Sequence, residues 1–206
     1  MAKVTLTEFL TLDGVVQAPG GPDEDRDGGF EHGGWLVPYA DEDMGRFVEE
    51  GFRSADAFLL GRRTYQIFAA YWPRVTDADN LVANSLNTLP KYVASRTLDG
   101  VGWHNSTLLK GDAVQEVAAL KERLEGELQI HGSGNLARSL MAHGLIDEYR
   151  LLTYPVILGA GKRLFDGGAV PAALERTGGR TTSTGVAINT YRVAGPPGHG
   201  SFEPQE

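Results

Sequence analysis

The sequence AFLLGRRTYQIFAA, residues 57–70, contains the pattern that decides the fold. Its first four residues, Ala57 to Leu60, form an apolar run of strand length, and Gly61 follows them as a turn signal. From Arg62 to Ala70 the apolar residues return at the spacing of a helix. The stretch therefore predicts a buried strand, a glycine turn and a helix, which is the repeating unit of an α/β domain.

The same alternation continues on both sides of this stretch. Strands are predicted over residues 3–12, 91–95, 127–131 and 148–155, and helices over residues 41–54, 112–124 and 135–143. Residues 174–193, with Gly178, Gly179 and Gly185 as turn signals, have the pattern of antiparallel strands. We therefore expect a mostly parallel central sheet with helices on both faces and antiparallel strands closing its C-terminal edge.

Composition limits the class of protein. The 206 residues suit one domain, which we expect over residues 1–194, and the Gly- and Pro-rich residues 195–206 are predicted to be a disordered tail. A formal charge of -8 disfavours binding to nucleic acid or to anionic membranes, and no long apolar run predicts a membrane span. The absence of cysteine excludes disulfides and thiolate metal sites and is consistent with the cytoplasm. No histidine spacing predicts a metal site.

Three turns that follow predicted strands have residue types suited to phosphate. They are Gly61-Arg62-Arg63-Thr64, Ser95-Arg96 and Gly132-Ser133-Gly134-Asn135-Leu136. Glycine permits close backbone approach, the free N–H groups of a helix start attract anions, and arginine adds charge-assisted hydrogen bonds. The first turn alone is equally consistent with a solvated helix start. The other two, taken singly, are weaker signals, and for Ser95-Arg96 a plain polar turn is the favoured interpretation. Together they lie at the carboxyl ends of strands, where open α/β sheets bind ligands, so we expect one nucleotide site.

Six motifs occur in a recognisable order along the chain. They are T-L-D-G at residues 11–14, G-G-W at 33–35, G-R-R-T-Y at 61–65, V-A-S-R-T at 93–97, H-G-S-G-N-L at 131–136 and P-V-I-L-G-A-G-K-R-L-F at 155–165. The sequence resembles, over residues 3–194, the reductase half of the bifunctional riboflavin-biosynthesis deaminase-reductase in a stand-alone form. That family has the three-layer fold of dihydrofolate reductase.

The resemblance implies an NADPH site and neighbouring substrate contacts. Arg62, Arg63 and Thr64 would lie near the cofactor phosphates, Ser95 and Arg96 at the adenosine end, and the turn from Gly132 to Leu136 around the pyrophosphate. Trp35 would lie close to the cofactor. Arg53 matches an arginine that contacts the ribose phosphate of the substrate, and Asp13 lies in a loop beside the nicotinamide. Homodimer formation through the sheet edge or the P-V-I-L-G segment is a further implication.

Two departures from the family leave the substrate open. The riboflavin enzyme has a substrate-contacting glutamate before its glycine turn, where this chain has His131, and an acidic residue where this chain has Phe68. His131 can act as a hydrogen-bonding or protonating group, or as an ordinary satisfied histidine. The aromatic residues Tyr65, Phe68, Tyr71 and Trp72 fit a stacking surface or a core equally well. Asp41 and Asp43 are candidate proton donors that also fit helix-start charges, so the catalytic acid is unassigned.

The preferred hypothesis is an enzyme, an NADPH-dependent reductase that transfers hydride to a small pyrimidine- or pterin-like heterocycle, similar to 5-amino-6-(5-phosphoribosylamino)uracil reductase. A non-catalytic nucleotide-binding or sensing module on the same fold is the alternative. A phosphate-sugar binding or transferase domain is a third hypothesis, and it predicts no preference for the NADPH 2′-phosphate. The loop over residues 17–34 is long and without apolar periodicity, which is typical of a functional or mobile loop and makes it a candidate to cover the site.

Overall fold

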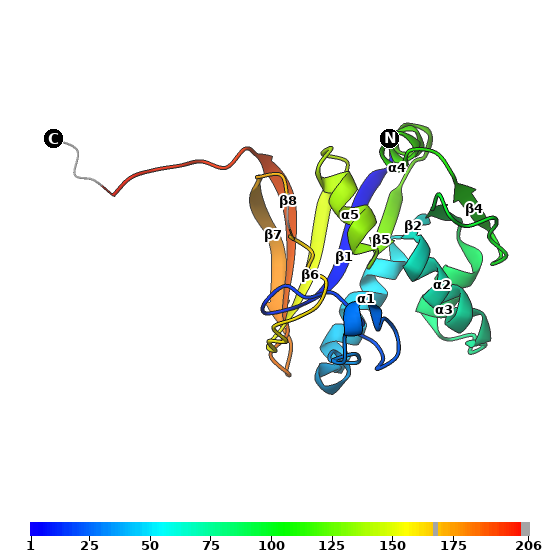
Figure 1. The fold of residues 1–206 in the computed structure, drawn as a ribbon, viewed down its shortest axis with the longest axis horizontal. Helices are drawn as coiled ribbons and strands as arrows, with labels where there is room; N and C mark the ends of the chain where they lie inside the picture. Colours follow the sequence, from blue (N-terminus) through cyan, green and yellow to red (C-terminus); the bar gives the residue numbers. More distant parts are fainter. Residues whose placement is uncertain (167–168, 203–206) are drawn as a thin grey trace.

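A computed structural model describes residues 1–166 and 169–202. In this part of the chain the strands form one eight-stranded sheet with the order β4-β3-β2-β5-β1-β6-β8-β7 (Figure 1). The strands are β1 (Lys3–Thr11), β2 (Ala57–Gly61), β3 (Lys91–Ala94), β4 (Ser106–Leu109), β5 (Glu127–His131), β6 (Glu148–Tyr154), β7 (Ala173–Thr181) and β8 (Ala187–Gly195). From β4 to β6 the pairing is parallel, and β8 and β7 are antiparallel. The sheet expected from the sequence is confirmed.

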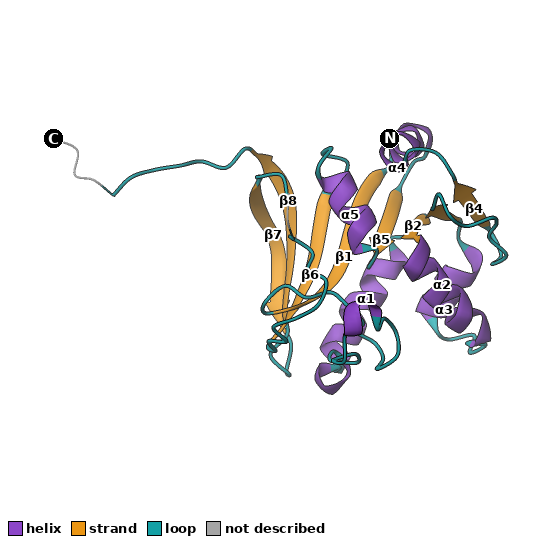
Figure 2. Cartoon of the chain, in the orientation of Figure 1, coloured by secondary structure: helices purple, strands orange, loops and turns teal. Residues whose placement is uncertain are grey.

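Helices cover both faces of the sheet (Figure 2). They are α1 (Glu42–Arg53), α2 (Arg62–Tyr71), α3 (Leu81–Thr88), α4 (Ala113–Arg123) and α5 (Gly134–Met141), with short 3₁₀ turns η1 (Asp27–Gly29), η2 (Val37–Tyr39) and η3 (Trp72–Arg74). The helices α4 and α5 pack on one face, and α1 and α3 pack on the other. The result is the three-layer arrangement of an α/β domain.

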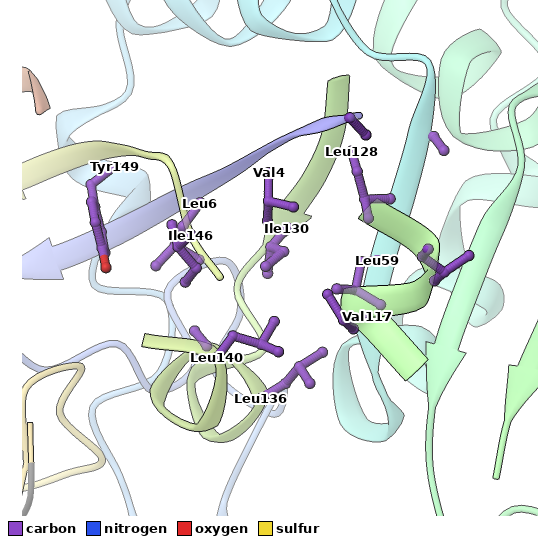
Figure 3. Close-up of a cluster of buried hydrophobic side chains, with 14 of the residues drawn as sticks. Val4, Leu6, Leu59, Val117, Leu128, Ile130, Leu136, Leu140, Ile146 and Tyr149 are labelled. Carbon is purple, nitrogen blue, oxygen red and sulfur yellow. The ribbon is translucent and has the colours of Figure 1, made fainter. Parts of the chain in front are cut away.

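The central strands are buried on both faces because helices cover both sides of the sheet. On the α4 and α5 side, a cluster joins the sheet to the two helices (Figure 3), and it includes Val4, Leu6, Leu59, Val117, Leu128, Ile130, Leu136 and Leu140. Successive side chains of a strand point to opposite faces, so Phe58 and Leu60 of β2 belong to the other cluster with Phe52 of α1. The ends of these rigid central strands position the site.

Two elements were missed by the sequence analysis. The helix α3 has few strong helix formers, but Asn80 caps it by accepting a hydrogen bond from the Ala83 N–H at 2.9 Å, and Ala83 and Leu86 are buried. Tertiary packing therefore stabilises a segment of weak local propensity. The strand β4 is a short edge strand that pairs with β3, so its sequence lacks the apolar run of a central strand.

The turn predicted at Gly178 and Gly179 was wrong. Both residues lie inside β7, where the register with β8 shifts between Arg176 and Gly178. A Cβ atom at Gly179 would lie 2.6 Å from the Ile188 carbonyl oxygen, so close backbone approach at a bulge explains the glycine. The hairpin turn is made instead by the residues around Gly185, which has a φ of 86°.

The end of the chain follows β8, which extends to Gly195. Residues 196–202 contain no helix or strand and run away from the sheet (Figure 1), while the rest of the tail expected over residues 195–206 lies outside the described residues. No helix in the described ranges is both long and apolar enough to cross a membrane.

Candidate active site

The three turns singled out in the sequence line one cavity of about 920 Å³. They follow β2, β3 and β5, which are neighbours in the sheet and run in the same direction. Their carboxyl ends therefore meet at one edge, as the sequence analysis expected. The residues that line the cavity include Gly61, Arg62, Arg63, Thr64, Ser95, Arg96, Gly132, Ser133, Gly134, Asn135 and Leu136.

Hydrogen bonds join the first turn to the third. The Gly61 N–H donates to Ser133 Oγ at 2.9 Å, and the Ser133 N–H donates to Thr64 Oγ1 at 3.1 Å. Ser133 adopts a left-handed conformation with a φ of 63°, which is costly for a residue with a Cβ. The bonds to Gly61 and Thr64 hold this conformation, so the relative position of the two turns is fixed.

Two of the three helices that begin at the cavity have no side-chain cap. The helix α2 begins after Gly61 and α5 after Ser133, and neither residue accepts a capping hydrogen bond from its helix. In α4, by contrast, Asp112 accepts hydrogen bonds from the N–H groups of Val114 and Gln115. The first turns of α2 and α5 therefore present N–H groups and positive dipole ends to an anion, whereas the start of α4 is already satisfied.

Arginines add positive charge around this end of the cavity. Arg62 and Arg96 are exposed at its rim. Ser95 shapes the second turn, because its hydroxyl oxygen accepts hydrogen bonds from the N–H groups of Thr97 and Leu98. Arg138 of α5, which the sequence analysis did not single out, also lines the cavity and donates to the Arg163 carbonyl oxygen at 2.7 Å. The chemistry of this half of the cavity suits phosphate groups.

The loop over residues 17–34 borders the cavity through Asp25. The Asp25 carboxylate accepts a hydrogen bond from Arg63 at the start of α2 and another from Lys162 at 2.9 Å. Burial raises the pKa of Asp25, but the bonds from Arg63 and Lys162 outweigh burial and lower it to about 2. The loop therefore borders the cavity, and Asp25 holds it there as a carboxylate.

The other half of the cavity is apolar and aromatic. Phe47, Val48 and Phe52 of α1 line it together with Phe68 of α2 and Trp72. The rings of Phe68 and Trp72 meet edge to face, with centroids 6.2 Å apart. Among the other aromatic candidates, Tyr65 is buried in the core and Tyr71 is exposed to solvent, so neither lines the cavity. This half suits a flat, weakly polar ligand.

His131 lies in the cavity wall at the end of β5. Its ring stacks on Phe52 with centroids 4.6 Å apart, and Nε2 is 2.9 Å from the Oε1 atom of Gln129. The amide nitrogen of Gln129 donates to the Gly51 carbonyl oxygen, so Oε1 is the acceptor and the imidazole donates from Nε2. Burial, and secondarily the charge of Arg150, lowers the pKa of His131 to about 3. The neutral ring is a hydrogen-bonding group and has no proton to supply as an acid near pH 7.

Arg150 of β6 is a cavity residue that the sequence analysis missed. It makes two hydrogen bonds to the Glu127 carboxylate, at 2.8 and 3.1 Å, and one to Glu148 at 2.9 Å. Its side chain is only 13% exposed, so these two carboxylates satisfy a nearly buried guanidinium. Strand alternation places it beside Thr7 of β1, where it forms the polar wall of the aromatic half.

The structure corrects three expected site residues. Trp35 is 7% exposed, packs edge to face on Tyr154, and donates from its indole nitrogen to the Gln17 carbonyl oxygen at 2.8 Å. It therefore anchors the base of the loop and does not line the cavity. Arg53 faces solvent with an ion pair to Glu49 at 3.7 Å, because it lies in the last turn of α1 on the side away from the cavity.

Asp13 is the third correction. Its carboxylate accepts hydrogen bonds from the Thr11 hydroxyl and from the N–H groups of Leu158 and Gly159, and it pairs with Arg163 at 3.3 Å. The Thr11 hydroxyl and then the backbone N–H groups lower its pKa to about 2. Asp13 thus fastens the segment after β6 to the turn after β1 and lies outside the cavity.

Both helix-start acids considered as proton donors are structural. Asp41 caps α1, accepting from the Met44 N–H at 2.9 Å and from the Ser183 hydroxyl at 2.8 Å. Asp43 pairs with Arg46 in the next turn. The carboxyl group that does face the cavity from the sheet is Glu8 of β1, 2% exposed, which the sequence analysis overlooked. Its sequence signal is a charge in the otherwise apolar series Val4, Leu6, Leu10 on one face of a central strand.

Within residues 1–166 and 169–202, histidine, aspartate and glutamate side chains do not gather into a group of three that could hold a metal ion. The cavity combines an arginine-rich half, an aromatic half and the Glu8 carboxyl group.

The sheet order, the antiparallel strands at one edge and the cavity across the strand ends define the class as a dihydrofolate reductase-like α/β fold. The chain belongs to the RibD C-terminal domain family, whose model matches residues 2–188. The resemblance inferred from the six motifs is thereby confirmed.

Individual relatives agree with this assignment. The Bacillus subtilis (strain 168) protein YyaP is 27% identical over 195 residues, covering 94% of this chain and 96% of its own. A putative riboflavin biosynthesis protein from Shewanella sp. PV-4 has the same fold, with a TM-score of 0.70, 23% identity and coverage of 94% of this chain and 99% of its own. Dihydrofolate reductase from Enterococcus faecalis, solved in complex with NADP(H), gives a TM-score of 0.59 at 14% identity, covering 93% and 96% of the two chains.

Proposed function

We propose that this protein is an NADPH-dependent reductase that transfers hydride to a C=N or C=O bond in a small heterocycle of the pyrimidine or pterin type. The observation that carries the proposal is that one cavity joins a phosphate-binding half to an aromatic half. A dinucleotide bound with its phosphates in the arginine-rich half would extend its nicotinamide end toward the aromatic half. Membership of the RibD C-terminal domain family supports the same reaction class.

The arginine-rich half fits the phosphates of the cofactor. The uncapped starts of α2 and α5 supply N–H donors for a pyrophosphate, and Gly132 and Gly134 allow the backbone to approach it. Arg62 stands at the rim beside the start of α2. Ser95 and Arg96, at the end of β3, are suited to the 2′-phosphate that distinguishes NADPH from NADH.

The aromatic half fits a planar substrate. Phe52, Phe68 and Trp72 provide apolar surface for stacking, and neutral His131 and charged Arg150 provide fixed polar contacts at its wall. The bond from His131 to Gln129 leaves Nδ1 as the acceptor atom of the ring, so it suits a substrate N–H or O–H. Arg150 suits a carbonyl oxygen or a substrate phosphate.

When bound, NADPH supplies the hydride. The residues of this chain orient the substrate and limit its access to water: the aromatic side chains hold the ring plane, while His131 and Arg150 select its polar edge. The loop held by Asp25 shields the same cavity from solvent. Such positioning lowers the barrier by removing rotational freedom before the reaction begins.

Titration with NADPH and NADH tests the proposal through tryptophan fluorescence. Trp72 lines the cavity, whereas Trp35 is a core residue, so quenching is expected to come mainly from Trp72. We expect NADPH to bind at least about tenfold more tightly than NADH, equivalent to about 1.4 kcal/mol. Absence of binding by either nucleotide would contradict the proposal. Tight binding without reduction of any pyrimidine or pterin in a substrate panel would support a nucleotide-sensing module.

A further inference from the structure

Glu8 lies where two central strands separate. The ladder between β1 and β5 ends with the pair Thr7 and His131 and a hydrogen bond from the Gly132 N–H to the Thr7 carbonyl oxygen at 3.3 Å. Glu8 is the next residue of β1, and there β1 continues to pair with β6 alone. Side chains alternate along a strand, so Glu8 and Phe9 point to opposite faces, yet both line the cavity. The cavity therefore extends from one face of the sheet to the other at Glu8, where the arginine-rich half meets the aromatic half.

The Glu8 carboxyl group is without a hydrogen bond or ion pair to the part of the chain that the structure describes. Its side chain is 2% exposed, and Oε1 is buried without a hydrogen bond to any described residue. The other carboxylates that line the cavity are all engaged. Glu24 accepts from the N–H groups of Gly20 and Gly21, and Asp25, Asp27 and Asp112 are held by Arg63, Lys162 and the start of α4.

The positive groups nearby do not neutralise Glu8 either. Basic side chains reach the cavity from α2, the turn after β3, β5, α5, β6 and the segment after β6, and they are Arg62, Arg63, Arg96, His131, Arg138, Arg150 and Lys162. Arg150 is bound to Glu127, and Lys162 is bound to Asp25 and Asp27. Burial is the cause that raises the pKa of Glu8 to about 8, so the group carries a proton at neutral pH.

A purely structural role does not explain this side chain. Glu8 shares the apolar face of β1 with Val4, Leu6 and Leu10, where a leucine would pack without any polar group to desolvate (Figure 3 shows Val4 and Leu6). A buried carboxyl group without a hydrogen bond lowers stability. Because this carboxyl group lies where the two halves of the cavity meet, we expect it to interact with a bound ligand.

We propose that Glu8 is the acid that protonates the substrate during reduction, a role that rests on the proposed reductase function. The substrate carbon of a C=N bond accepts the hydride of the reduced nicotinamide cofactor, which is thereby oxidised. The π electron pair moves to nitrogen, and that nitrogen takes the proton from the Glu8 carboxyl group. Glu8 is left as a carboxylate and regains a proton from solvent when product leaves. For a C=O substrate, oxygen takes the same proton.

The test compares wild type with Glu8→Gln, which keeps the shape of the side chain without its acidic proton. Glu175→Gln, at an exposed ion pair on β7, is the control for loss of one carboxylate. Hydride transfer is followed in single turnovers of NADPH with a panel that includes 5-amino-6-(5-phosphoribosylamino)uracil and 7,8-dihydrofolate. We expect Glu8→Gln to bind NADPH within about twofold of wild type and to transfer hydride at least about a hundredfold more slowly.

Two further readouts separate catalysis from structure. The wild-type rate is expected to fall about tenfold for each pH unit above about 8, as the Glu8 proton is lost, and the residual rate of Glu8→Gln is expected to be flat there. The infrared carbonyl band of a protonated carboxyl group should be present in wild type at pH 7 and absent from Glu8→Gln. An unchanged rate and pH profile in Glu8→Gln would overturn the role of Glu8 while the reductase function stands. Failure of wild type to bind NADPH or to reduce any substrate would overturn the reductase function itself.

Discussion

The Ser133 hydroxyl oxygen accepts a hydrogen bond from the backbone N–H of Gly61 at 2.9 Å. These residues stand at the ends of two adjacent parallel strands, β5 and β2, directly before the helices α5 and α2. The bond therefore sets the spacing between the two uncapped helix starts that face the cavity. A pair of anion-binding helix termini held at a fixed spacing is suited to a ligand with two linked phosphates.

Removal of this bond should weaken both the fold and cofactor binding. In Ser133→Ala the Gly61 N–H loses its acceptor, so we expect about 1 kcal/mol loss of unfolding free energy by urea denaturation. Because the helix starts are then less well fixed, NADPH affinity should fall by roughly tenfold. Ser85→Ala in α3, outside the cavity lining, is the control. Wild-type NADPH affinity in Ser133→Ala would show that the spacing does not matter.

Arg96 should determine the preference between the two nicotinamide nucleotides. Its guanidinium is exposed at the cavity rim after β3, and a hydrogen bond to a charged group contributes about 1.5–3 kcal/mol. Arg96→Ala is therefore expected to weaken NADPH binding by about tenfold to a hundredfold and to leave NADH binding nearly unchanged. Arg74→Ala, an exposed arginine of η3 outside the cavity, should change neither. Equal losses for both nucleotides would place Arg96 away from the 2′-phosphate.

The tryptophans Trp35 and Trp72 should separate stability from ligand binding. Trp35→Phe removes a buried hydrogen bond to Gln17, so the unfolding free energy should fall by about 1–3 kcal/mol while NADPH still quenches fluorescence. Trp72→Phe should be close to wild type in stability but lose most of the quenching, because Trp72 lines the cavity. Loss of quenching in Trp35→Phe, with quenching retained in Trp72→Phe, would instead place Trp35 beside the cofactor.

Asp25 should make the free energy of unfolding depend on pH in the acid range. Its pKa is lowered to about 2 in the folded protein, below its ordinary value of 3.8. The stabilisation is therefore complete above about pH 4 and is lost as pH falls toward 2. Since Arg63 is half exposed, we expect the contribution to be no more than about 1 kcal/mol. Asp25→Asn should lose this part of the acid dependence, and amide hydrogen exchange should accelerate in residues 17–34. An unchanged exchange pattern would show that Asp25 does not hold the loop.

Much of the fold could be predicted because the alternation of apolar strands and amphipathic helices is local. The three turns were also predictable, since the carboxyl ends of parallel strands meet at one edge. Contacts between residues far apart in the sequence could not be predicted. Glu127, which binds Arg150, lies in another strand, and Lys162, which binds Asp25, lies far along the chain, so no spacing in the sequence reveals these pairs. Trp35 was misplaced because its hydrogen bond to Gln17 depends on how the loop folds.

Glu8 illustrates a different limit. Both faces of β1 are buried, so the position of a carboxylate in this strand signals burial but does not show whether it faces a core or a cavity. Only the separation of β1 from β5 after Thr7 makes Glu8 a cavity residue. Asp41 and Asp13 were easier to notice because they stand at element ends, and both proved to be structural.

The most direct test of the central claim is a crystal structure of the protein with NADPH bound. We predict the pyrophosphate between the first turns of α2 and α5, the 2′-phosphate beside Ser95 and Arg96, and the nicotinamide next to Glu8 where β1 leaves β5. A cofactor bound elsewhere, or no bound cofactor at saturating NADPH, would contradict the account.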